Sequence, residues 1–128
     1  MTASVARVLI VDANIGFATR LSIDLQRLGF HVATAFTVVS AERVASELRP
    51  DVVLADDQYG AARLQSLRAV LLGTEACGPT ARFICLVQTA AAGRSLVDAG
   101  FDAAWLKSAE VSDSVAHLQA SFGVAYSL

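Results

Sequence analysis

The chain has 128 residues, of which 55% are hydrophobic and 17% charged, and its formal net charge is −2. This length suits one domain with a single core, and the composition excludes a disordered chain, which would be poorer in apolar residues. The slight negative charge excludes the basic field of a nucleic-acid-binding or membrane-surface domain, and no apolar run approaches the roughly 20 residues that span a bilayer. We expect one cytoplasmic domain over residues 1–128, with its core from about residue 6 to residue 123.

Five apolar runs have the length of β-strands. The runs at residues 8–11, 52–55 and 83–87 are unbroken and rich in β-branched residues, which is typical of strands covered on both faces. The runs at 31–36 and 103–106 are weaker and suit strands nearer an edge of the sheet.

Helical patterns lie between and after these runs. The apolar stripes are Phe17, Leu21, Leu25 and Leu28; Ala41, Val44, Ala45 and Leu48; Leu64, Leu67 and Leu71; and Val115, Leu118 and Phe122. Gly29 and Pro50 end the first two helices, and a short helix around residues 94–99 ends at Gly100. The alternation predicts an α/β fold, a doubly wound parallel sheet with helices on both faces.

Charged residues gather where the predicted strands end. Asp12 follows the first strand, Asp56 and Asp57 follow the third, and Lys107, the only lysine, follows the fifth. Each acid alone is readily explained as a helix cap, and the lysine alone as a surface charge. Their placement at one edge of a parallel sheet favours a site. Asp57 is expected to face away from Asp56, to cap or solvate the loop.

Three motifs carry a resemblance to a known family. They are Val-Leu-Ile-Val-Asp12, Pro50-Asp51-Val-Val-Leu-Ala-Asp56, and Ala99-Gly100-Phe101-Asp102 leading to Lys107. With this order and spacing, the chain resembles the receiver domain of bacterial two-component response regulators from about residue 7 to residue 122. The resemblance implies a flavodoxin-like, five-stranded sheet in the order 2-1-3-4-5.

The resemblance also implies roles for particular residues. Asp56 matches the aspartate that accepts a phosphoryl group from a histidine kinase. Asp12, Asp56 and the backbone carbonyl of Gln58 match the ligands of Mg²⁺, and Lys107 matches the lysine that contacts the phosphoryl group.

The sequence departs from the family pattern at the same site. Ala13 replaces the second carboxylate of the metal-binding pair, so we expect Mg²⁺ binding to be weak. Val87 replaces the Ser/Thr that contacts the phosphoryl group, and Thr89 is the candidate substitute. Ala104 replaces the aromatic residue that moves with that Ser/Thr. Ser108 replaces a proline, which predicts a trans bond after Lys107.

We therefore predict a degenerate or pseudo-receiver that acts by protein–protein interaction, with little or no phosphorylation and no enzyme activity. Its partner would be a histidine kinase, a regulator or a second copy in a homodimer, docked on a surface that includes Ala104 and Trp105. No nucleic acid or membrane partner is expected.

Two alternatives stay open. One is a receiver still phosphorylated on Asp56. The other is a small flavodoxin-like nucleotide binder or enzyme, although Asp12 to Gly16 is no phosphate-binding loop and His31 and His117 are not placed for catalysis. Binding of a cyclic dinucleotide on an arginine-bearing surface also stays open.

Overall fold

The computed structural model describes residues 6–73 and 81–107. The elements follow in the order β1 (Arg7–Val11), α1 (Ile15–Arg27), β2 (His31–Ala35), α2 (Val38–Leu48), β3 (Val52–Asp56), the 3-10 turn η1 (Asp57–Tyr59), α3 (Ala61–Gly73), β4 (Arg82–Val87), α4 (Ala90–Asp98) and β5 (Ala103–Leu106). The five predicted strands and the four helices between them are confirmed. The last predicted stripe, Val115, Leu118 and Phe122, lies outside the described residues, as do Ser108 and His117.

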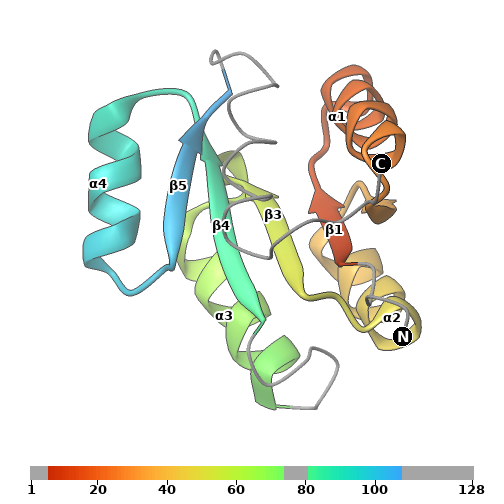
Figure 1. The fold of residues 1–128 in the computed structure, drawn as a ribbon. Coiled ribbons are helices and arrows are strands. Elements are labelled where there is room, and N and C mark those ends of the chain that lie inside the picture. The colour runs from red at the N-terminus through yellow and green to blue at the C-terminus, as the bar shows by residue number, and fades with distance from the viewer. Residues whose placement is uncertain (1–5, 74–80, 108–128) are drawn as a thin grey trace.

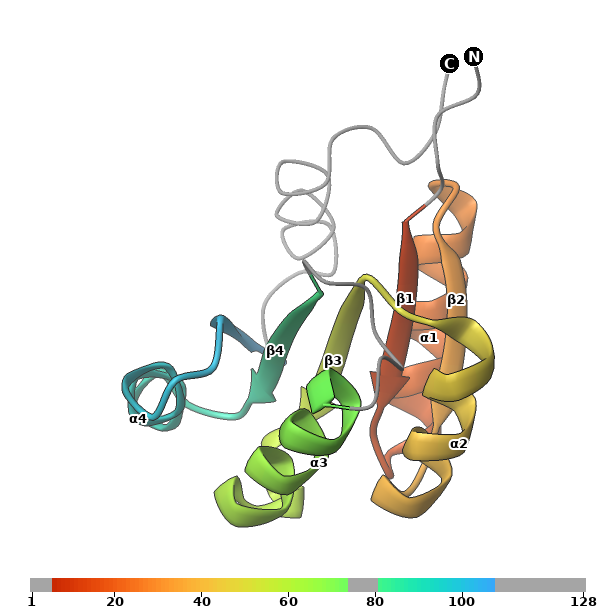
Figure 2. The ribbon, with the colours of Figure 1, turned by 90° about the horizontal axis from the view of Figure 1, so that it is seen from below.

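The strands form one parallel sheet in the order β2-β1-β3-β4-β5 (Figures 1 and 2). The predicted flavodoxin-like α/β architecture and 2-1-3-4-5 order are confirmed. The helices α2 and α3 lie side by side on one face, α1 covers the other, and α4 packs beside β5 (Figures 1 and 2). The strand order reverses between β1 and β3, so the place where such sheets bind ligands is outside the carboxyl ends of these two strands.

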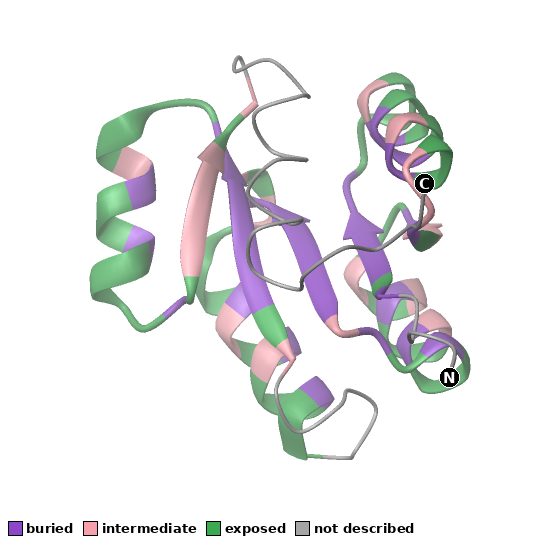
Figure 3. Cartoon of the chain, viewed as in Figure 1, coloured by how far each residue is buried: buried purple, intermediate pink, exposed green. Residues whose placement is uncertain are grey.

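Alternate strand residues supply two separate apolar clusters. Leu9 and Val53 pack with α2 and α3, whereas Ile10 and Leu54 pack with α1. Every residue of β3 is buried, as are those of β1 and β4 after the first (Figure 3). Full burial of one such aliphatic side chain contributes about 1.5–3 kcal/mol to the stability of the fold. These three strands therefore form a stable support for the residues at their carboxyl ends.

Local signals fix where the helices begin and end. Asn14, Thr37 and Thr89 cap α1, α2 and α4, each accepting a hydrogen bond from a backbone N–H three residues later. After α1, Gly29 adopts φ 93°, and after α2, Arg49 adopts φ 54° just before Pro50, as the predicted stops require. Among the described residues, no helix is both long and apolar enough to cross a bilayer.

The helix α4 begins at Ala90, earlier than the helix expected around residues 94–99. Its first turn is the run Ala90, Ala91 and Ala92, which has high helix propensity but shows no apolar stripe. Hydrophobic periodicity therefore missed this turn.

Two aspartates of the family-like motifs serve the sheet at its amino end. Asp51, just before β3, accepts a hydrogen bond from the Arg7 backbone N–H at 2.8 Å. Asp102, just before β5, accepts one from the Phe83 N–H at 2.7 Å. Each carboxylate thus ties the start of one strand to its neighbour, at the edge of the sheet opposite Asp12 and Asp56.

Candidate functional site

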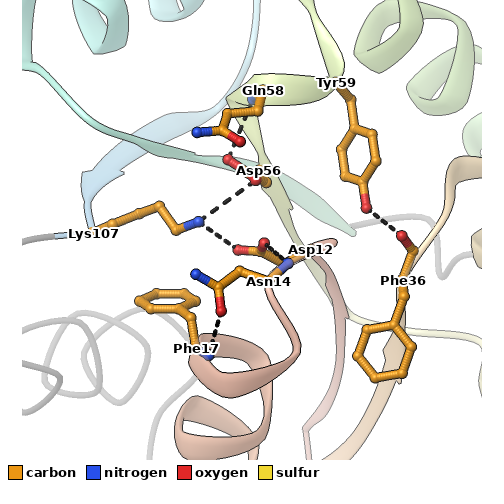
Figure 4. A network of polar contacts seen from close by, with 8 residues as sticks. All are labelled: Asp12, Asn14, Phe17, Phe36, Asp56, Gln58, Tyr59 and Lys107. Carbon is orange, nitrogen blue, oxygen red and sulfur yellow. Dashed lines mark hydrogen bonds and ion pairs between the residues drawn. The ribbon is translucent and has the colours of Figure 1, made fainter.

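Three of the predicted site residues meet at the carboxyl edge of the sheet. Asp12 follows β1, Asp56 ends β3 and Lys107 follows β5 (Figure 4). The Lys107 ammonium lies 2.8 Å from Asp12 Oδ2 and 3.5 Å from Asp56 Oδ2, and its side chain is only 8% exposed. Asp12 is 0% and Asp56 2% exposed. Their joint placement, predicted from the strand ends, is confirmed.

The backbone holds the remaining oxygen of each carboxylate. Asp12 Oδ1 accepts from the Asn14 N–H at 2.8 Å, and Asp56 Oδ1 accepts from the Gln58 N–H at 3.2 Å. Asp56, rather than Asp57, therefore caps the turn η1. Asp57 is partly exposed, and its Oδ1 is buried without a hydrogen-bond partner among the described residues. Of the two roles expected for Asp57, capping or solvating the loop, the capping role therefore belongs to Asp56 instead.

Burial dominates the electrostatics of Asp12. Desolvation raises the pKa of its carboxyl, and the charge of Asp56 adds to the rise, while Lys107 and the Asn14 N–H lower the pKa by less. Burial also raises the pKa of Tyr59, and the charges of Asp12 and Asp56 raise it further. Its hydroxyl donates to the Phe36 carbonyl at 2.7 Å (Figure 4). Because two carboxylates contact one ammonium, the pocket carries excess negative charge.

An aromatic ring supports the lysine. The Lys107 Nζ lies 4.6 Å from the centre of the Phe17 ring, on the first turns of α1, a distance at which a cation is attracted to the ring face. Sequence reasoning counted Phe17 only as a residue of the helix stripe. Its position five residues after Asp12 was the available signal.

The donor set falls short of a normal magnesium site. Mg²⁺ prefers six oxygen ligands in octahedral geometry. Ala13 is exposed and brings only a methyl group, and the described residues contain no group of three or more His, Cys, Asp or Glu side chains that could hold a metal. What remains is Asp12, Asp56 and the Gln58 carbonyl, and both carboxylates already contact Lys107. These residues do not fit a fully formed site.

Val87 and Ala104, two positions that depart from the family pattern, both lie next to Gly93 of α4. A Cβ atom placed on Gly93 of α4 would lie 3.1 Å from Ala104 Cβ and 3.4 Å from Val87 Cγ2. A surface hollow of about 380 Å³ opens here between α4 and β5. It is lined by Val87, Ala90, Gly93, Arg94, Val97, Asp98, Ala104 and Leu106. The importance of Gly93 was not foreseen.

Two other predicted residues lie apart from the pocket. The Thr89 hydroxyl accepts from the Ala92 N–H at 3.1 Å as the cap of α4, and no hydrogen bond joins it to Asp56 within the ranges described. Trp105 packs against the apolar cluster that includes α1, whereas Ala104 packs against the opposite cluster, which includes α2, α3 and Leu96 of α4. Trp105 thus points away from Ala104, as its place in the strand predicted.

Solved structures with the same architecture include a receiver domain from Methylobacillus flagellatus, with 23% identity, a TM-score of 0.74, and coverage of 91% of this chain and 98% of that one. The Vibrio cholerae chemotaxis protein CheY4 matches with 22% identity, a TM-score of 0.74 and the same coverages. The fold is that of a response-regulator receiver domain. A Burkholderia pseudomallei response regulator with a phosphorylated aspartic acid and a calcium ion matches this fold with 22% identity and a TM-score of 0.68. The match covers 96% of this chain and 76% of that one. Searches of protein-family models and of curated proteins gave no significant match.

Proposed function

We propose that this chain is a receiver-type signalling domain of a bacterial two-component system, acting in the cytoplasm by protein contacts with little or no phosphorylation of Asp56. The observation that carries the proposal is the trio of Asp12, Asp56 and Lys107 at the carboxyl edge of a receiver fold. The substitutions Ala13 and Val87 beside it support the degenerate reading. The proposal describes a signalling module rather than an enzyme.

Phosphoryl transfer depends on positioning and on charge stabilisation around the transferred group. Asp56 would be the acceptor and Lys107 the phosphoryl contact, with Mg²⁺ held weakly by Asp12, Asp56 and the Gln58 carbonyl. Val87 is 1% exposed and apolar, so it supplies no hydroxyl where the family uses one. Thr89 is engaged at the start of α4. The pocket therefore lacks two of the groups that would stabilise transfer.

The proposed docking surface is the α4–β5 hollow. In the family, the residue at the position of Ala104 is an aromatic ring that moves on phosphorylation. Here the small residues Val87, Gly93 and Ala104 leave room for a partner's apolar side chain. Val97 and Leu106 are 43% and 38% exposed at its rim. A histidine kinase, another regulator or a second copy in a homodimer would be the partner. Nucleic acid is disfavoured by the net charge of −2.

Phosphorylation is tested by incubating the protein with Mg²⁺ and acetyl phosphate and measuring its intact mass. Asp56→Asn is the matched control, because it removes the acceptor oxygen with little change in shape. We expect no phosphorylated fraction in either protein. A mass increase of one phosphoryl group in wild type that Asp56→Asn abolishes would contradict the proposal.

That contrary result would establish the second candidate, a receiver that still takes phosphate on Asp56. The contact of all three retained side chains favours it, as does the phosphorylated aspartic acid of the similar Burkholderia protein.

Docking is tested with Val97→Asp and Leu106→Asp in pull-downs and sedimentation measurements. Leu72→Asp is the control, since Leu72 of α3 is 48% exposed and lies away from the hollow. We expect a captured kinase or regulator, or the dimer, to be lost in the first two variants and kept in the third. Equal behaviour of all three would exclude this surface.

A further inference from the structure

The pocket presents two buried acids with one cation between them. Asp12 and Asp56 are both almost fully buried, and a buried carboxylate is costly unless a positive charge or hydrogen bonds compensate it. With no third acid in the group among the described residues, one positive charge leaves a net charge of −1. The question is which cation supplies this compensation.

Lys107 is held at both ends of its side chain. Its backbone N–H donates to the Val87 carbonyl at 2.8 Å, which continues the pairing of β5 with β4. Its ammonium lies between the two carboxylates, above the Phe17 ring (Figure 4). The side chain is thus positioned by Asp12 just after β1, by Asp56 at the end of β3 and by Phe17 of α1.

The oxygens that a metal would need are already engaged. Each Oδ1 accepts a backbone hydrogen bond, and each Oδ2 contacts the ammonium. Asp12 Oδ2 has no other partner in the described part of the chain, so its compensation depends on Lys107 alone. A divalent ion would have to displace the lysine and would then find no third carboxylate at Ala13.

We propose that the ammonium group of Lys107 is the resident cation of this pocket, filling the place of a divalent metal ion and making the fold independent of metal. The poor fit of the remaining oxygen ligands to Mg²⁺ then follows, because the lysine ammonium occupies the place of the metal ion. The position at which a metal would bind rests on the proposed receiver function, but the test of this inference involves no phosphorylation. Phosphorylation of Asp56 with no effect of Mg²⁺ on the unfolding midpoint would defeat the proposed function alone, whereas a rise of the wild-type midpoint with Mg²⁺ but no phosphorylation would overturn this inference alone.

The test measures thermal unfolding of the full chain with and without Mg²⁺. The midpoint of wild type should not change with millimolar Mg²⁺. Lys107→Met, which keeps much of the side-chain volume and removes the charge, should lower the midpoint by about 10 °C or more, because it leaves buried acids uncompensated. Mg²⁺ should then raise the midpoint of this variant in a concentration-dependent way.

A double variant, Lys107→Met with Asp12→Asn, separates this effect from loss of packing. It removes the repulsion between the acids, so it should recover stability without Mg²⁺ and lose the Mg²⁺ response. If Lys107→Met alone does not fold, folding of the double variant still supports the proposal and its failure to fold contradicts it. A saturable Mg²⁺ stabilisation of wild type, or a Lys107→Met variant as stable as wild type, would overturn the proposal.

Discussion

Restoring the missing carboxylate with Ala13→Asp should convert the pocket into a better metal site. Ala13 is exposed and directly follows Asp12, so a carboxylate there would act largely in a water-like dielectric. Two unit charges 4 Å apart in water interact by about 1 kcal/mol, so a divalent ion gains about 2 kcal/mol from one more carboxylate. This corresponds to roughly 30-fold tighter Mg²⁺ binding.

The assay is a Mg²⁺ titration followed by the backbone amide resonances of Asn14 and Gln58, whose N–H groups bond to the two acids. Ala13→Asn is the matched control, because it adds an oxygen of similar reach without the charge and should gain much less. In the absence of Mg²⁺, Ala13→Asp should also be less stable than Ala13→Asn, since three acids would then share one lysine. Equal Mg²⁺ affinity in wild type and both variants would show that residue 13 does not face the metal position, and the reasoning would fail.

Further predictions concern the support of the sheet and the buried thiol. Asp102→Ala should lower the free energy of unfolding by about 1.5–3 kcal/mol in urea denaturation, because it removes a charge-assisted bond to the Phe83 N–H. Asp98→Ala removes a carboxylate that is also exposed but does not tie two strands together, so it should change the free energy little; equal losses would argue against the strand tie. Burial raises the pKa of Cys85 from 9.0 to about 12. Above pH 9.0 the unfolded state therefore loses the thiol proton first, and stability should fall by up to about 1.4 kcal/mol per pH unit until about pH 12. Cys85→Ala should lack this part of the alkaline slope, and identical slopes would contradict the assigned pKa. Tyr59→Phe should cost about 0.5–1.5 kcal/mol in the same denaturation assay through loss of its bond to the Phe36 carbonyl, and an unchanged stability would show that water replaces the bond.

The parts of the fold that the sequence predicts best are those with strong local patterns. The unbroken apolar runs predicted β1, β3 and β4, because strands buried on both faces need apolar residues on both sides of the pleat. Gly29 and Pro50 predicted the helix ends for conformational reasons. The alanine-rich start of α4 escaped this reasoning, since its helix propensity leaves no periodic signal.

The site was predictable in its membership but not in its contacts. The strand ends placed Asp12, Asp56 and Lys107 on one edge, because parallel strands share their carboxyl side. Which oxygen meets the ammonium depends on backbone geometry after each strand, and so the preference of Lys107 for Asp12 over Asp56 could not be derived. The capping role of Asp56 and the approach of Phe17 likewise depend on tertiary placement.

The measurement that tests the central claim most directly is the amide spectrum of the full chain with Mg²⁺ and beryllium fluoride, a mimic of the phosphoryl group. If the pocket is a degenerate receiver site filled by Lys107, the resonances of Asp56, Gln58 and Lys107 should show no saturable change. Saturable shifts at these residues in wild type that disappear in Asp56→Asn would contradict the account.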